Sequence, residues 1–150
     1  MYLDDGLLYN SSRSVLLEQI KIVKSDLFRC GITINEDKSV WIPSNNLKWL
    51  GININLSSLM FEVPEGKRVK VLGHICKARS SQCSTAKLFA QLVGYLVSLR
   101  CAIGPVAYIK TRFLQMAIRD APAWNLVFPI GDEVKTELRF WESYLSRVAL

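Results

Sequence analysis

Long apolar runs are missing from this sequence of 150 residues, and so is a leader segment of the secretory type. No stretch reaches the roughly 18 consecutive apolar residues that a membrane-spanning helix requires. The most apolar run, residues 88–103, contains Gln91, Ser98 and Arg100, which is typical of a buried helix. The first residues carry no basic region ahead of an apolar segment. We therefore expect an intracellular protein, in the cytoplasm or the nucleus, with no membrane as a partner.

The cysteines lack the pairing expected of a redox motif or a zinc site. Cys30, Cys76, Cys83 and Cys101 form no Cys-x-x-Cys pair and lie within apolar segments. The spacing of His74, Cys76 and Cys83 matches no familiar tetrahedral zinc site, and no fourth ligand is apparent. These observations predict reduced, structural cysteines without zinc.

Internal repeats and low-complexity tracts are also absent, and charge is unevenly placed. Half of the residues are hydrophobic and 21% are charged, so the chain is expected to fold around a core. Residues 61–120 hold ten Lys or Arg against three Asp or Glu, whereas residues 1–60 are balanced at six of each. A basic middle third suits a surface that binds a polyanion, although a solubilising face would have the same charge.

The first 63 residues predict an amphipathic helix that covers a small sheet. Apolar residues recur at helical spacing from Leu16 to Leu27, after Ser11-Ser12 as a cap and before Gly31 as a stop. Gly51 suits a bulge or a tight turn between two strands. The runs with strand character are residues 32–34, 40–42, 47–50, 52–56 and 61–63.

From Pro64 onward the pattern predicts helices alone, so the fold class is α+β with a subdomain boundary near residue 63. A helix over residues 65–79 would carry a basic face, and a long helix would run from residue 84 to residue 103. A loop is expected over residues 124–131, and a final helix begins at Asp132. The apolar stripes expected in the last three helices are Leu88, Leu92, Leu96, Leu99 and Ile103; then Val106, Ile109, Phe113 and Met116; then Val134, Leu138, Trp141, Leu145 and Val148.

Two adjacent carboxylates form the main chemical signal. The segment Tyr2-Leu3-Asp4-Asp5-Gly6 places Asp4 and Asp5 beside apolar residues and a glycine. Carboxylate oxygens are the ligands that Mg²⁺ prefers, and a hairpin tip presents them to phosphate-bound metal. An ordinary acidic turn has the same composition. On its own, the segment does not decide between these interpretations.

The sequence downstream resembles the reverse transcriptases of retroelements. Tyr-x-Asp-Asp is the active-site signature of that family, and the elements that follow it there occur here in the same order over about 120 residues. The closest likeness is to DIRS-like, tyrosine-recombinase-encoding retrotransposons, through Tyr2–Gly6, the Arg112 region and residues 137–141. The matched elements are a helix, Gly31, a strand and turn ending at Lys38, a primer-grip core Leu47–Gly51, the pair Val63-Pro64, and Leu92-Val93-Gly94.

The resemblance implies an architecture and an activity. Residues 1–63 would be the carboxyl-terminal half of a polymerase palm with its primer-grip hairpin. Residues 64–120 would be an all-helical thumb, and residues 121–150 would begin the connection toward an RNase H domain. The complete enzyme would be an RNA-directed DNA polymerase that extends a primer by two-metal phosphoryl transfer with Mg²⁺.

The resemblance also implies roles for particular residues. Asp4 and Asp5 would be the catalytic metal ligands, and Lys38 would act as the general acid toward pyrophosphate. Tyr2, Trp49, Leu50 and Gly51 would contact the nucleotide and the primer end. The residues expected to bind the template–primer duplex are Lys67, Lys70, Lys77, Gly94, Lys110 and Arg112.

Alternatives remain at three of these positions and for the chain as a whole. Lys38 could be a solvated turn lysine, Trp49 a core residue, and Gly94 a site of close helix packing. The family also needs an upstream aspartate and a fingers region that precede its signature, so we expect this chain to bind template–primer without polymerising. Residues 1–63 would then lack part of their apolar cover. The rival functions are a non-catalytic nucleic-acid-binding module and a helical protein–protein adaptor.

Overall fold

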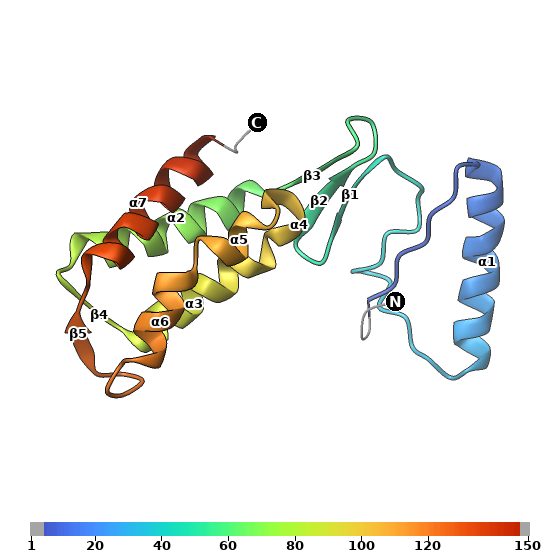
Figure 1. The fold of residues 1–150 in the computed structure, drawn as a ribbon. Coiled ribbons are helices and arrows are strands. Elements are labelled where there is room, and N and C mark those ends of the chain that lie inside the picture. Colours follow the sequence, from blue (N-terminus) through green and yellow to red (C-terminus); the bar gives the residue numbers. More distant parts are fainter. Residues whose placement is uncertain (1–4, 148–150) are drawn as a thin grey trace.

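The structure, a computed structural model, describes residues 5–147 as a mixed α+β chain with two small antiparallel sheets (Figure 1). The helices are α1 (Arg13–Arg29), α2 (Glu65–Ser80), α3 (Ala86–Ser98), α4 (Arg100–Ile103), α5 (Val106–Ile109), α6 (Arg112–Arg119) and α7 (Asp132–Arg147). The strands are β1 (Asn46–Trp49), β2 (Ile52–Asn55), β3 (Met60–Glu62), β4 (Cys83–Thr85) and β5 (Val127–Pro129). The predicted α+β class is confirmed, and no helix within residues 5–147 is long and apolar enough to cross a membrane.

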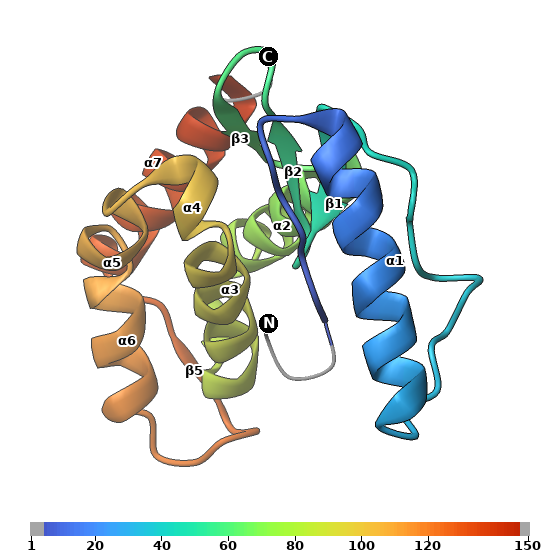
Figure 2. The same cartoon turned by 90° about the vertical axis from the view of Figure 1, so that its right-hand side faces the viewer.

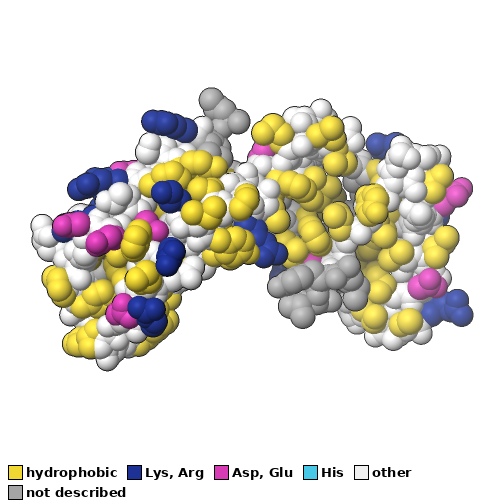
Figure 3. Space-filling view, in the orientation of Figure 1, with side chains coloured by type: hydrophobic (Ala, Val, Ile, Leu, Met, Phe, Trp, Pro, Cys, Tyr) yellow, Lys and Arg dark blue, Asp and Glu magenta, His cyan; other side chains and the backbone are white. Residues whose placement is uncertain are grey.

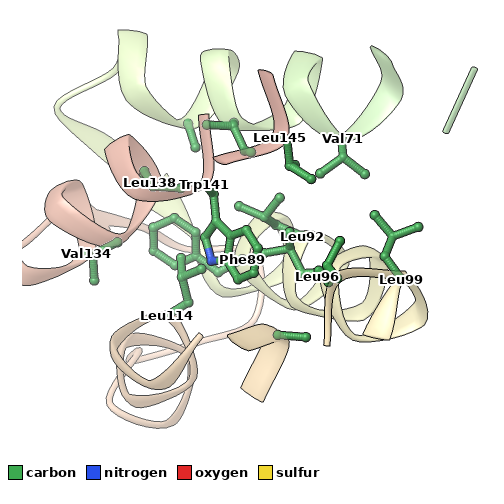
Figure 4. Packing of buried hydrophobic residues seen from close by; sticks show 14 of the residues in the cluster. Val71, Phe89, Leu92, Leu96, Leu99, Leu114, Val134, Leu138, Trp141 and Leu145 are labelled. Atoms are coloured by element: carbon green, nitrogen blue, oxygen red, sulfur yellow. The ribbon is translucent and has the colours of Figure 1, made fainter. Parts of the chain in front are cut away.

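Residues 64–147, here called the helical body, contain nearly all of the core. Helix α2 packs against α3 and α7, and α6 also packs against α3 and α7, so the four helices surround one apolar interior. Trp141 lies at its centre, fully buried, and its indole nitrogen donates to the Lys110 carbonyl at 2.6 Å. Figure 4 shows Phe89, Leu92 and Leu138 gathered around it. The stripe predicted for α7 is confirmed from residue 134 to residue 145.

Helix α7 shares this core with α2 and α3, although the sequence placed it in a segment separate from residues 64–120. Its buried Glu137 carboxylate accepts the Leu114 backbone N–H at 3.0 Å. That N–H lies in the first turn of α6, where it has no partner within the helix. A side chain from the last helix therefore caps an earlier one, a contact that the sequence pattern did not indicate.

A three-stranded sheet joins the helical body through Ile52, which is buried in the same core. Trp49 pairs with Ile52 across the β1–β2 hairpin, which leaves Leu50 and Gly51 as a two-residue turn. Both turn residues have positive φ, 48° and 74°, which is the requirement of a type I′ turn. The tight turn expected at Gly51 is confirmed, and so are the strands predicted near residues 47–50, 52–56 and 61–63.

The rest of the N-terminal part, residues 5–63, packs much less tightly. Ser12 caps α1 as expected, and Gly31 follows it with φ of 72°. None of the 17 residues of α1 is buried, and Figures 1 and 2 show the helix at the edge of the molecule. The expectation that this helix covers a sheet is therefore wrong. The strands predicted over residues 32–34 and 40–42 are also wrong, since both runs lie in a loop without a ladder partner.

Three predictions for the helical body need correction. The long helix expected over residues 84–103 starts at Ala86 and breaks at Leu99 into α3 and α4. The helix expected after Pro105 is split into α5 and α6, and the predicted stripe is largely exposed, with Ile109 at 67% and Phe113 at 40%. The residues buried there are Ala107, Thr111 and Leu114. The loop expected at residues 124–131 contains β5, which pairs with β4.

Candidate nucleic-acid interface

The predicted metal ligands fall at the edge of the described chain. Tyr2 and Asp4 lie outside the described residues, and Asp5 is exposed. Within residues 5–147, no three His, Cys, Asp or Glu side chains gather as metal ligands do. Of the two expected carboxylates, Asp5 alone lies within the described residues, and the Mg²⁺ site stays a prediction.

Lys38 lies in a turn after α1. Its backbone N–H donates to the Asn35 carbonyl and to the Asn35 side-chain oxygen, both at 3.2 Å, and its side chain is exposed. Neighbouring Glu36 accepts from Lys24 at 3.1 Å and from the Trp41 indole at 2.8 Å, which holds the loop against α1. This geometry describes a solvated turn lysine. A role as general acid stays a prediction.

The primer-grip residues form the exposed end of the β1–β2 hairpin. Leu50 is exposed and Gly51 is half-buried, and the Lys67 ammonium of α2 donates to the Gly51 carbonyl at 3.4 Å. Trp49 is half-buried, and its indole N–H is buried without a hydrogen-bond partner among the described residues. The hairpin turn therefore lies directly against the first turn of α2. Lys48, which precedes Trp49, is part of the predicted primer-grip core but was not among the residues predicted to bind.

Helix α2 carries the predicted basic stripe, and α3 contributes an aromatic ring beside it. The Lys70 ammonium lies 4.9 Å from the centre of the Tyr95 ring, and the His74 ring stacks on Tyr95 at 5.2 Å. Lys77 continues the stripe and is exposed. Because residues three and four apart on a helix share a face, Lys67, Lys70, His74 and Lys77 all lie toward α3. We call these four residues, with Gly94 and Tyr95, the α2–α3 face.

Gly94 is an open position of this face. It is exposed in the middle of α3, and a Cβ built on it would meet nothing within 4 Å. Close packing against a neighbouring helix is therefore excluded as the reason for this glycine. The exposed residues of α3 repeat at the same spacing on either side of it, as Lys87, Gln91 and Ser98. The outer surface of α3 is consequently a polar stripe, and Gly94 is the position in it that has no side chain.

The other predicted contacts are not brought to this face. Lys110 lies between α5 and α6, with its ammonium 5.2 Å from the centre of the Phe140 ring of α7. Arg112 begins α6 and is exposed. Helix α7 pairs with α2 through Arg79 and Glu142, neither of which belongs to the α2–α3 face. Four of the six predicted duplex-binding residues, Lys67, Lys70, Lys77 and Gly94, therefore share one surface.

The electrostatics of the hairpin end follow from its lysines. Partial burial lowers the pKa of the Lys67 ammonium, and the nearby positive charge of Lys48 lowers it further. Figure 3 shows a group of Lys and Arg side chains between the helical body and the hairpin, next to apolar side chains. Glu65, the acidic residue in the first turn of α2, is paired with Arg68 at 2.6 Å. The cluster at the turn is thus positive.

Lys48 and Tyr95, which the sequence-based prediction missed, are direct sequence neighbours of predicted residues. Lys48 directly precedes the Trp-Leu-Gly segment, and Tyr95 directly follows Gly94. In comparisons with known proteins, no family model, no curated protein and no solved structure matches this chain.

Proposed function

We propose that this chain is part of an RNA-directed DNA polymerase of the reverse transcriptase type, and that its α2–α3 face binds the template–primer duplex. The observation that carries the proposal is the open surface at Gly94 beside the lysines of α2. Gly94 belongs to the segment Leu92-Val93-Gly94, which resembles part of the thumb helix that follows the minor groove in that family. The structure leaves that position free for a ligand.

The chemistry of the face fits a sugar-phosphate backbone. Lys67, Lys70 and Lys77 supply ammonium groups along one side of α2, spaced over three helical turns. Such contacts give affinity without sequence reading, because they address phosphates that every base pair carries. Tyr95 adds a flat apolar surface between the lysines and Gly94. A duplex that lay across the face would place its backbone on α2 and a groove on α3.

Binding is expected without primer extension by the 150-residue chain. Asp4 and Asp5 are adjacent, and adjacent residues of a strand point to opposite sides. Two such carboxylates alone do not clamp two metal ions between an attacking and a leaving oxygen. Metal-dependent nucleotide addition by this chain in a primer-extension assay would contradict this part of the proposal.

The experiment that tests the binding site is the substitution Gly94→Leu. A side chain at this position meets open space, and leucine is a better helix former than glycine, so the variant should gain about 0.5–1 kcal/mol of stability. The same side chain would project from the α2–α3 face at position 94, where the duplex is proposed to lie, and should weaken duplex binding at least tenfold. Binding would be measured by fluorescence anisotropy with a labelled RNA–DNA duplex.

Ser25→Leu is the control. Ser25 lies exposed on α1, outside the α2–α3 face. We expect duplex affinity to stay unchanged in this variant. Equal affinity losses in both variants, or no duplex binding by the wild-type chain, would contradict the proposed function.

A further inference from the structure

An apolar groove lies where α6, β5 and the start of α7 meet, and it shares no residue with the α2–α3 face. It has a volume of about 410 Å³ and is open to solvent. Its apolar lining includes Phe113 and Met116 of α6, Phe128 of β5 and Val134 of α7. Figure 3 shows apolar and acidic side chains together over this end of the helical body. We call this hollow the α6–α7 groove.

The lining of the groove is held in place by the core. Helix α6 has apolar side chains on both of its faces, so Leu114 is fully buried while Phe113 is 40% exposed and Met116 is 37% exposed. Phe128 joins the groove to the core, because its ring meets the Phe89 ring edge-on with centroids 5.9 Å apart. Phe89 is itself fully buried. A surface fixed in this way needs little further ordering when a partner binds.

The groove is acidic in a chain whose net charge is +6. Residues 120–134 hold three acidic residues and no Lys or Arg. Asp120 and Glu133 both line the groove, and Asp120 accepts two hydrogen bonds from Arg119, at 2.7 and 3.0 Å. Among the residues that the structure describes, Glu133 forms no ion pair. The groove therefore offers an unbalanced negative charge beside an apolar surface, which disfavours a phosphate and suits a cation.

We propose that the α6–α7 groove docks a partner protein through a segment in which a large apolar side chain lies next to Lys or Arg. This inference goes beyond the proposed function and does not depend on it. The apolar side chain would enter the hollow against Phe113 and Met116, and the cation would pair with Glu133. Such a contact joins a buried anchor, which supplies most of the affinity at protein interfaces, to a charge that selects the partner.

Short fluorescein-labelled peptides test the chemistry of the occupant on the 150-residue chain. One peptide contains leucine and lysine, a second contains leucine and glutamate, and a third of the same length contains serine and lysine. Fluorescence anisotropy should show saturable binding of the leucine–lysine peptide and about tenfold weaker binding of the other two. Equal affinity for the serine–lysine peptide would reduce the effect to net charge and overturn the proposal, as would a leucine–lysine peptide that does not bind.

Glu133→Lys tests whether the peptide occupies this groove. Reversing the charge should weaken binding of the leucine–lysine peptide about fivefold and strengthen binding of the leucine–glutamate peptide by a similar factor. Because a gain is expected for one peptide, a folding defect does not imitate the result. Glu18→Lys is the matched control, since Glu18 is exposed on α1 and undergoes the same change of charge outside the groove. Equal shifts in both variants would overturn the groove as the site.

Met116→Gln tests the apolar part of the contact and leaves the charge unchanged. It places an amide where the apolar anchor would lie, and should weaken binding of the leucine–lysine peptide about threefold. Leu59→Gln, at an 85% exposed position between β2 and β3, is the control and should have no effect. Sedimentation velocity should show a monomeric wild-type chain. Self-association that Glu133→Lys abolishes would make a second copy the occupant and overturn the proposal.

Discussion

Helices α1 and α7 have almost the same length and opposite surroundings. Helix α7, with 16 residues, buries five of them, and helix α1, with 17 residues, buries none. Both have apolar residues at helical spacing and both begin at a capping or acidic residue. The difference is that α7 meets α2 and α6, whereas Phe28 of α1 stays 83% exposed. Helical periodicity therefore describes what a helix could bury and does not supply the partner.

The same contrast holds between the two parts of the chain. Among the described residues 5–63, only Ile52 belongs to the buried apolar core, and it does so by reaching into the helical body. Short helices in water are marginal without tertiary packing. The helical body should thus unfold cooperatively, and the free energy of unfolding α1 should be much lower than that of the helical body. The following predictions test that difference, from the largest expected effect to the smallest.

The largest effect is expected from Trp141→Ala. This change removes the largest fully buried side chain and its hydrogen bond to the Lys110 carbonyl, and should cost about 3–5 kcal/mol. Urea denaturation followed by far-ultraviolet circular dichroism measures the loss. Phe28→Ala, on exposed α1, is the control and should stay within about 0.5 kcal/mol of wild type. Similar losses in both variants would remove the contrast between the two parts.

Glu137→Leu should destabilise the helical body by about 1.5–3 kcal/mol. The Leu114 N–H would lose a charged acceptor at 3.0 Å and remain buried without a partner. Glu137→Gln keeps an oxygen acceptor and should lose less. Glu133→Leu, at an exposed position one turn earlier on α7, is the control. If urea titrations give the same midpoint for both leucine variants, the capping role of Glu137 is refuted.

Glu36→Ala should act locally, by about 0.5 kcal/mol. Its carboxylate joins Lys24 of α1 to the Trp41 indole, and the Lys24 and Glu36 side chains are 37% and 61% exposed, which limits the strength of the pair. Hydrogen exchange should accelerate in residues 35–43 and leave the amides of α3 unchanged. Faster exchange throughout the helical body would mean that the two parts are coupled more tightly than their contacts indicate.

The smallest effect concerns pH. The hydrogen bond from Arg68 lowers the pKa of Glu65 below its usual 4.5 in the folded chain. A group with a lowered folded pKa stabilises the fold above its unfolded pKa and loses that contribution as pH falls through the folded value. The melting temperature should therefore fall slightly more in wild type than in Arg68→Gln between about pH 5 and about pH 3. Parallel curves would show that this exposed pair contributes nothing.

Sequence alone located the elements whose apolar stripe has a single period. The residues Val134, Leu138, Trp141 and Leu145 of α7 are buried as predicted, and the β1–β2 hairpin was located by the strand character of the runs on either side of Gly51. The α+β order and the change at Pro64 follow from these elements.

The prediction of buried residues was wrong where tertiary contacts decide which of two helix faces is buried. Over residues 106–116, the larger Ile109 and Phe113 were expected inside, but the buried residues are Ala107 of α5, Thr111 between α5 and α6, and Leu114 of α6. The break at Thr111 shifts the register, and no propensity marks it. Residues 32–34 have strand character but form no strand, because no other segment within residues 5–147 pairs with them. The polar segment 83–85 is a strand because it pairs with β5.

The candidate site was predicted in part. The basic stripe of α2 and the special position of Gly94 were visible in the sequence, as spacing and as an unusual mid-helix residue. The presence of Tyr95 and Lys48 at this site was not visible in the sequence, because it depends on how α2 packs against α3 and the hairpin. The separation of Lys110 from this face had the same cause.

The cap that Glu137 provides to α6 also imposes an order on synthesis. Leu114 leaves the ribosome 23 residues before Glu137, which at about 5–20 residues per second is an interval of roughly one to five seconds. During it, α3 and α6 can pair, yet the cavity that Trp141 will fill faces solvent. The newly made chain thus exposes this apolar interior until α7 arrives, and a slow codon after residue 120 would prolong that exposure.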